Sequence, residues 1–358
     1  MEIYFNSRYF GTRYLVILFG LVASTTFAST PSEMADFSLQ DLLSLSIDDT
    51  KEEEVNYTPW RFSLTYKQLR FDGYRSGTHG ISIDDVLFSP GEVKTDENFP
   101  VVPTEITQEA FIFSINYAIN HLSSINVSLP YIKQGTDHVS SVPNYENFLL
   151  ISDGVGDIAT NYSRVLKRWN EQLLTWSIGL SLPTGSIDEV GDTPREAGNQ
   201  QLPYTMQLGS GTWDIPLGLS YQKNASTWMW NASLLAKIRT GKNDRDYRLG
   251  NRLTFSLSSK WRTQHKIKPL AKLQYNNWGS IHGQDDEITV PNPTFPYPAA
   301  ITNPRYYGGK KVNAAIGVEY PLINQIITLE ISAPLYQDLN GIQYNEEMHF
   351  SVNWDLSF

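Results

Sequence analysis

The sequence contains no cysteine among its 358 residues, so disulfide bonds, thiolate nucleophiles and cysteine-ligated metal sites are excluded. Charged residues are scarce, at 18% of the chain against about 25% in ordinary soluble domains. The formal net charge of −10 argues against a general nucleic-acid-binding protein, which would carry a basic excess. The sequence therefore predicts no nucleic-acid partner.

Catalytic motifs are missing as well. The six histidines are scattered along the chain, without a Gly-x-Ser-x-Gly elbow or a glycine-rich phosphate loop. Two acidic sets, residues 284–287 and the pair Asp153 and Asp157, are the places where a divalent cation between lipopolysaccharide phosphates is conceivable. Because acidic loops are common, we expect no metal site, no cofactor and no enzymatic activity.

Long apolar runs are absent outside the N-terminus. Arg8 and Arg13 precede an uncharged apolar run at residues 14–22, and small and polar residues follow up to Ala28. This order is typical of a secretory signal peptide, with cleavage expected after Ala28. The apolar run is too short for a helical membrane anchor.

What the sequence does contain is strict alternation of apolar and polar residues. In residues 173–182 the even positions are Leu, Trp, Ile, Leu and Leu, whereas the odd positions after the first are small or polar. Successive side chains of a strand point to opposite faces, so each such segment has one apolar and one polar face. We expect twelve strands of this kind, near residues 60–70, 110–120, 124–133, 156–167, 173–183, 211–222, 228–239, 250–261, 266–278, 310–320, 326–335 and 347–358.

The connections between these segments are alternately short and long. The short ones include residues 121–123 and 321–325, and the long ones include 71–109, 134–155 and 279–309, with shorter loops in the long positions at 240–249 and 336–346. This order is typical of outer-membrane barrels, which have short periplasmic turns and long extracellular loops. The sequence thus predicts an all-β protein, a single transmembrane outer-membrane barrel of twelve antiparallel strands over residues 59–358 in a Gram-negative bacterium.

Large aromatic residues cluster at the strand ends beside the short turns, where they are expected to form a girdle at one membrane interface. Lipid and lipopolysaccharide are the partners that such a surface implies. The final residue, Phe358, ends an amphipathic strand and is similar to the signal read by the outer-membrane assembly machinery. The girdle residues are Trp60, Tyr117, Tyr221, Trp228, Trp230, Trp261, Tyr320, Trp354 and Phe358.

With the apolar face outward, the inward face carries more basic than acidic residues. A basic lining would favour anionic solutes by focusing the local field. The alternative is that the charges pair and brace a narrow lumen. The expected lining residues are Arg61, Lys67, Lys237, Arg239, Arg252, Lys260, Lys268 and Lys272 on the basic side and Asp214, Glu319, Glu330 and Asp355 on the acidic side.

A leader at residues 29–58 precedes the first strand. Part of it has apolar residues at helical spacing, and a helix this short needs a surface on which to dock. We expect it either to plug the barrel mouth or to remain an unfolded leader, with residues 48–54 as an acidic linker. The candidate plug residues are Phe37, Leu39, Leu42, Leu43 and Ile47.

Several stretches resemble the outer-membrane barrel transporter family named for the MetA pathway of phenol degradation. They are residues 125–131, 154–158, 178–186 and 208–221, the last reading Leu-Gly-Ser-Gly-Thr-Trp-Asp-Ile-Pro-Leu-Gly-Leu-Ser-Tyr. The resemblance implies a transporter of small, often aromatic or hydrophobic, compounds.

The function expected from the sequence is therefore an outer-membrane channel for passive passage of a small-molecule permeant, either anionic or aromatic and hydrophobic, with residues 36–47 as a gate. Two alternatives stay open. One is a plug-gated exporter of secreted, amyloid-like polypeptides, although no coiled coil precedes the barrel. The other is a structural or adhesive barrel that conducts nothing and acts through its long loops.

Overall fold

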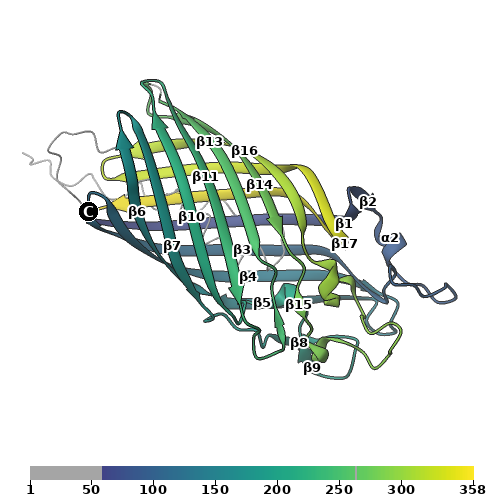
Figure 1. The fold of residues 1–358 in the computed structure, drawn as a ribbon. Coiled ribbons are helices and arrows are strands. Elements are labelled where there is room, and N and C mark those ends of the chain that lie inside the picture. The colour runs from purple at the N-terminus through teal and green to yellow at the C-terminus, as the bar shows by residue number, and fades with distance from the viewer. Residues whose placement is uncertain (1–58, 263) are drawn as a thin grey trace, which may run out of the picture.

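The computed structural model describes residues 59–262 and 264–358. The expected signal peptide, leader and plug residues lie outside this part. Eleven long antiparallel strands form a closed barrel (Figure 1). They are β1 (Trp60–Gly77), β3 (Val101–Asn120), β4 (Ser123–Ser140), β6 (Ile158–Trp169), β7 (Gln172–Leu182), β10 (Trp213–Asn224), β11 (Trp228–Thr240), β13 (Arg252–Trp261), β14 (Lys268–Trp278), β16 (Gly309–Leu322) and β17 (Gln325–Ser357).

Each barrel strand pairs with its neighbours in sequence order, and the barrel closes where β17 pairs with β1. Two further strands lie off this ring. Strand β2 (His79–Ile81) pairs with the end of β1, and β5 (Asn147–Val155) pairs with residues 131–139 of β4. Residues 123–128 of β4 pair with β6 instead, so β5 and β6 share one edge of β4. Within the described ring of eleven strands, closure pairs each strand on both sides, which removes the open edges that attract other chains.

Strand β17 replaces two of the expected strands. Its 33 residues cover the segments 326–335 and 347–358 and also the expected loop at 336–346. Residues up to Leu339 pair with β16, and later residues pair with β1. The chain reverses near Gly341, whose φ of 67° suits a glycine. The expected loop was too long because the alternation around residues 336–346 is weak, whereas pairing with both neighbours keeps this segment extended.

Other strands also run further than expected at the end of the barrel that carries the long connections. Strand β1 continues to Gly77, β3 begins at Val101, and β4 continues to Ser140. The expected loops at 71–109 and 134–155 therefore contain extended wall as well as β5 and the short helix α2 (Ile83–Val86). Figure 1 shows α2, β2, β8 (Val190–Asp192), β9 (Asn199–Gln201) and β15 (His282–Gly283) at the end opposite the C-terminus.

The outer face of the barrel is apolar. Its exposed residues alternate with buried polar ones, as in β4, where Ile125 and Val127 are exposed while Asn126 and Ser128 are buried. Phe111, Phe113 and many leucines on the other strands are likewise exposed. An apolar band on a closed barrel matches the lipid-facing surface of transmembrane barrels. No helix within the described ranges is long and apolar enough to cross a membrane.

The main apolar core lies inside the long-loop end of the barrel. Residues of β1 and β3 such as Leu69, Ile106 and Ile112 are almost fully buried there. They cluster with Leu208 and with Ala299–Ile301, which belong to two long connections that fold inward. These connections also contain η2 (Tyr204–Met206), η3 (Asp286–Ile288), η4 (Ala300–Thr302) and η5 (Pro304–Tyr306), and the connection between them contains β12 (Tyr247–Arg248).

Candidate functional site

The candidate site is the barrel lumen together with the loops that fold into its upper end. All twelve residues expected to line the lumen lie on barrel strands. Five are buried, namely Asp214, Lys237, Arg239, Arg252 and Glu319. The other seven are half-buried, namely Arg61, Lys67, Lys260, Lys268, Lys272, Glu330 and Asp355.

The structure gathers nine of these residues into small polar groups. On β10 and β11, Asp214 is bonded to the Arg239 guanidinium and lies 3.9 Å from Lys237 Nζ. These three side chains are at most 3% exposed as residues, so the carboxylate offsets part of the cost of burying two cations. On β1 and β17, the Ser63 hydroxyl donates to Asp355.

A second group lies on β13, β14 and β16. Glu319 contacts Lys260 Nζ at 2.9 Å and Lys268 Nζ at 3.9 Å. Lys272 Nζ lies 3.6 Å from Glu330 on β17. The Lys268 pair joins the neighbouring strands β14 and β16, whereas the Lys260 and Lys272 pairs each reach across one intervening strand on the inner face of the wall. They also leave the wall with more basic than acidic groups.

A third charged group was missed in the sequence. Lys311 and Glu346 are both buried and form an ion pair, and Asn313 Nδ2 donates to Glu346 at 2.7 Å. His349 Nε2 lies 2.7 Å from the same carboxylate. Glu346 escaped notice because it falls in the expected loop at 336–346. Lys311 shares the odd-numbered face with Glu319, so its parity could have revealed it.

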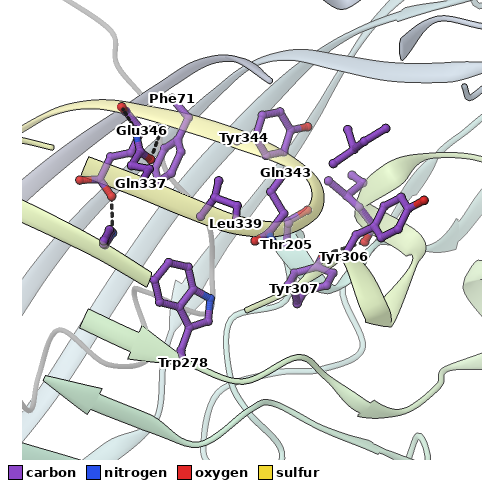
Figure 2. A pocket seen from close by; sticks show the side chains of 13 residues that line it. Phe71, Thr205, Trp278, Tyr306, Tyr307, Gln337, Leu339, Gln343, Tyr344 and Glu346 are labelled. Carbon is purple, nitrogen blue, oxygen red and sulfur yellow. Dashed lines mark hydrogen bonds and ion pairs between the residues drawn. The ribbon is translucent and has the colours of Figure 1, made fainter. Parts of the chain in front are cut away.

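An aromatic pocket lies between this charged group and the loops above it. Figure 2 shows Trp278, Tyr306, Tyr307 and Tyr344 around it, with Thr205 also on its wall. The Arg252 guanidinium and the Lys311 ammonium each lie 5.6 Å from the centre of the Trp278 ring. Both distances suit cation–π attraction. Trp278 therefore stands at the boundary between the aromatic pocket and the charged lumen below it.

A second cavity of about 50 Å³ lies in the charged lumen itself. Its volume exceeds the roughly 30 Å³ that one water molecule occupies in the liquid. Basic residues from four strands line it, together with amides and hydroxyls. They include Lys67 on β1, Arg252 on β13, Lys272 on β14 and Lys311 on β16.

At the end of the barrel that carries the long connections, the lumen is narrowed by residues 202–210, which we call the inner loop. Every residue of the inner loop is buried. The Ser152 hydroxyl of β5 donates to Met206 O at 2.7 Å, and Gln134 of β4 donates to Gln207 O at 3.4 Å. These donors lie on the inward faces of their strands, so the inner loop rests against the inside of the wall.

Tyrosines and one arginine hold the inner loop to the other inward-folded connections. Tyr204 packs edge-on against Tyr247 and Tyr307, and its hydroxyl accepts from the backbone nitrogen of Asp285 at 2.9 Å. Burial raises the pKa of Tyr204 well above its ordinary value, so the phenol stays neutral. Arg245 lies between these connections and forms ion pairs with Asp188, Asp285 and Glu287.

The two acidic sets considered for a cation do not form cation sites. Asp153 faces outward and accepts from the Tyr131 hydroxyl, whereas Asp157 faces inward and binds Ser210. In the stretch 284–287, Asp285 and Glu287 are engaged by Arg245. Among the described residues, no group of three or more potential ligands is placed to hold a metal ion.

The residues expected to form the girdle stand on barrel strands near the short connections, and their place at a membrane interface stays a prediction. Trp60 and Tyr117 have ring centres 4.5 Å apart, and Trp228 stacks on Trp261 at 5.8 Å. Trp60, Trp228, Trp230, Trp261 and Phe358 are exposed, whereas Tyr221, Tyr320 and Trp354 are half-buried.

Comparison with known proteins extends only to the fold. No family model matches the sequence, and no curated relative is found by sequence similarity. Among solved structures, an outer-membrane channel from Pseudomonas putida F1 has a TM-score of 0.53 at 13% identity, over 87% of this chain and 100% of that one.

Two further structures are less similar. They are the transport unit of the autotransporter AIDA-I from Escherichia coli (TM-score 0.42, 10% identity, 92% of this chain and 100% of that one) and a mutant of the TodX monoaromatic hydrocarbon channel (TM-score 0.43, 10% identity, 84% and 91%). At these TM-scores, neither carries an argument. The chain is thus similar in fold to an outer-membrane channel from Pseudomonas putida F1.

Proposed function

We propose that this chain is an outer-membrane channel for the passive passage of small solutes. The observation that carries the proposal is the closed barrel with an apolar outer face and a charged inner face. In lipid, a closed barrel satisfies every backbone hydrogen bond, and its polar interior is compatible with water. The fold similarity to an outer-membrane channel agrees with it.

The proposal includes twelve membrane crossings. The two parts of β17 pair with different neighbours, β16 and β1. The side-chain amide of Gln337 in the first part forms hydrogen bonds with the backbone of Glu346 in the second. Counted as two crossings, β17 makes the number of crossings even. An even number brings both ends of the barrel chain to the same side of the membrane.

The solutes are proposed to be small anions. With Lys311 and Glu346 included, basic lining residues still outnumber acidic ones, although the whole chain is acidic. Aromatic solutes are the second candidate class, because Trp278 and the three tyrosines around the upper pocket offer flat apolar surfaces. An anion with an aromatic or apolar part would contact both regions in turn.

Gating by residues 36–47 remains part of the proposal, with Phe37, Leu39, Leu42, Leu43 and Ile47 as the plug. These residues lie outside the described ranges. The described chain adds the inner loop as a second constriction, because it rests inside the wall above the charged lumen.

The test is conductance and reversal potential of the mature protein in a planar bilayer with a salt gradient. We expect an anion-preferring pore, with larger conductance in a variant lacking residues 29–55. The double variant K268Q/K272Q should lose part of the anion preference, whereas K133Q, on the exposed outer face of β4, should not. Absence of current in all variants would favour the non-conducting barrel, and a pore too wide to select would favour the polypeptide exporter.

A further inference from the structure

A patch of amide and hydroxyl groups lies on the inner face of β4 and β6. It consists of Asn126, Ser128 and Asn161, which are 6%, 0% and 5% exposed. Asn126 and Asn161 stand directly opposite each other in the register of the two strands, and Ser128 is the next inward residue of β4. The outward neighbours Ile125 and Val127 are exposed, so the patch faces the lumen.

The patch has unused hydrogen-bonding capacity. Within residues 59–262 and 264–358, both polar atoms of the Asn126 carboxamide, the Ser128 hydroxyl and the Asn161 Nδ2 atom have no hydrogen-bond partner. Buried polar side chains in proteins almost always have such a partner. Together these atoms offer donors and acceptors without any charge, which is the pattern that complements a hydroxyl group.

The backbone of β7 leaves room for the patch. Gly179 stands opposite Asn161, and a side-chain carbon at that glycine would lie 2.1 Å from Asn161 Oδ1. The Asn161 carboxamide therefore occupies the space that any larger residue at position 179 would fill.

The opposite wall is charged. In the sheet order β4 and β6 are separated from β14 and β16 by several strands in both directions, so the two pairs lie on opposite sides of the barrel. Lys268 and Lys272 are on β14, paired with Glu319 and Glu330. One side of the lumen thus carries neutral hydrogen-bonding groups, and the opposite side carries more basic than acidic residues.

We propose that the patch of Asn126, Ser128 and Asn161 is a binding site for the hydroxyl groups of small hydroxylated carboxylates such as sugar acids. The proposal rests on the proposed channel and names its solute class. The carboxylate of the solute is attracted to the basic side of the lumen, which carries Lys268 and Lys272, and its hydroxyl groups form hydrogen bonds with the patch. A carboxylate of equal charge and length without hydroxyl groups leaves the patch unsatisfied.

The test compares gluconate with hexanoate, which share one negative charge and six carbon atoms but differ in hydroxyl groups. Reversal potentials in the bilayer give the permeability of each anion relative to chloride. We expect gluconate to be favoured over hexanoate in the natural protein. The ratio should fall several-fold in N126A/N161A and stay unchanged in S233A, which removes a buried inward hydroxyl of β11.

Calorimetric titration of gluconate into the detergent-solubilised protein provides a readout independent of current. Binding that is present in the natural protein and S233A but lost in N126A/N161A supports the site, even if no current flows. Chloride current with no preference for gluconate, or equal gluconate binding by the double variant, overturns the site and leaves the channel proposal standing. Gluconate binding without any current overturns the channel proposal alone.

Discussion

The carboxylate of Asp157 accepts two hydrogen bonds from Ser210, one from its backbone nitrogen at 2.9 Å and one from its hydroxyl at 2.6 Å. The backbone nitrogen of Gly185 donates to the same carboxylate at 3.0 Å. Asp157 lies between β5 and β6 in the wall, and Ser210 is the last residue of the inner loop. This carboxylate therefore fastens the inner loop to the wall.

Replacing Asp157 with alanine should release the inner loop. The change leaves buried donors unpaired, at about 1–3 kcal/mol for each. We expect a lower midpoint of heat unfolding and a higher single-channel conductance, since the inner loop narrows the lumen. D137A removes an exposed outward carboxylate of β4 and serves as the control. Unchanged conductance in D157A would mean that the inner loop does not limit the current.

Trp278 should separate the aromatic pocket from the charged lumen. The variant W278A removes the ring that both Arg252 and Lys311 approach at 5.6 Å, each contact being worth about 0.5–1 kcal/mol or more. We expect higher conductance and, because both cations remain, a stronger preference for anions. Reversal potentials measure this, with W213A on the exposed outer face as the control. A weaker anion preference would contradict this reading of Trp278.

Arg245 should hold the inward-folded connections together. It contacts Asp188 at 2.7 Å and Glu287 at 2.9 Å, but both carboxylates are largely exposed. Solvent screening therefore limits what these two exposed pairs contribute to the loss of stability in R245Q to roughly 1 kcal/mol. We expect faster trypsin cleavage in the long loops, followed by mass spectrometry. K242Q, which breaks an exposed pair with Asp246, is the matched control and should be cleaved at the natural rate.

Acid should tighten the same connections. Burial raises the pKa of Asp285 above its ordinary value, although Arg245 and the backbone of Glu287 oppose the shift. Protonation therefore relieves the cost of burying this charge, and the packed connections gain stability relative to released ones as the pH falls through the raised pKa. Conductance should fall in this range in the natural protein, and the fall should begin at higher pH in R245Q, where Arg245 no longer opposes the shift. Identical pH profiles for the two proteins would rule out this pair as the cause.

The girdle should contribute to stability in the membrane. Trp228 and Trp261 stack at 5.8 Å, and an aromatic pair of this kind is worth about 0.5–1.5 kcal/mol beyond the area it buries. W228A should lower the temperature at which the barrel loses its compact gel mobility, without changing its ion preference. V93A, at an exposed position outside the barrel strands, should leave that temperature unchanged.

Much of the fold could be predicted because side-chain alternation is local. In each strand, the order of apolar and polar residues indicates which side chains face out. Ile178 and Leu253 could therefore be assigned to the outer face, and Lys237 and Glu319 to the inner face, from the sequence. The aromatic residues of the expected girdle could be placed near the short connections for the same reason.

Long-range pairing accounts for the rest. Side-chain alternation was enough to predict a barrel of strands with an apolar exterior and charged residues facing inward, because these features follow from the period of two along each strand. Alternation could not predict that β17 closes on β1, that Glu346 pairs with Lys311, or that the inner loop rests inside the wall. Such contacts join residues far apart in the chain, and their strength depends on what each segment meets after the barrel has closed.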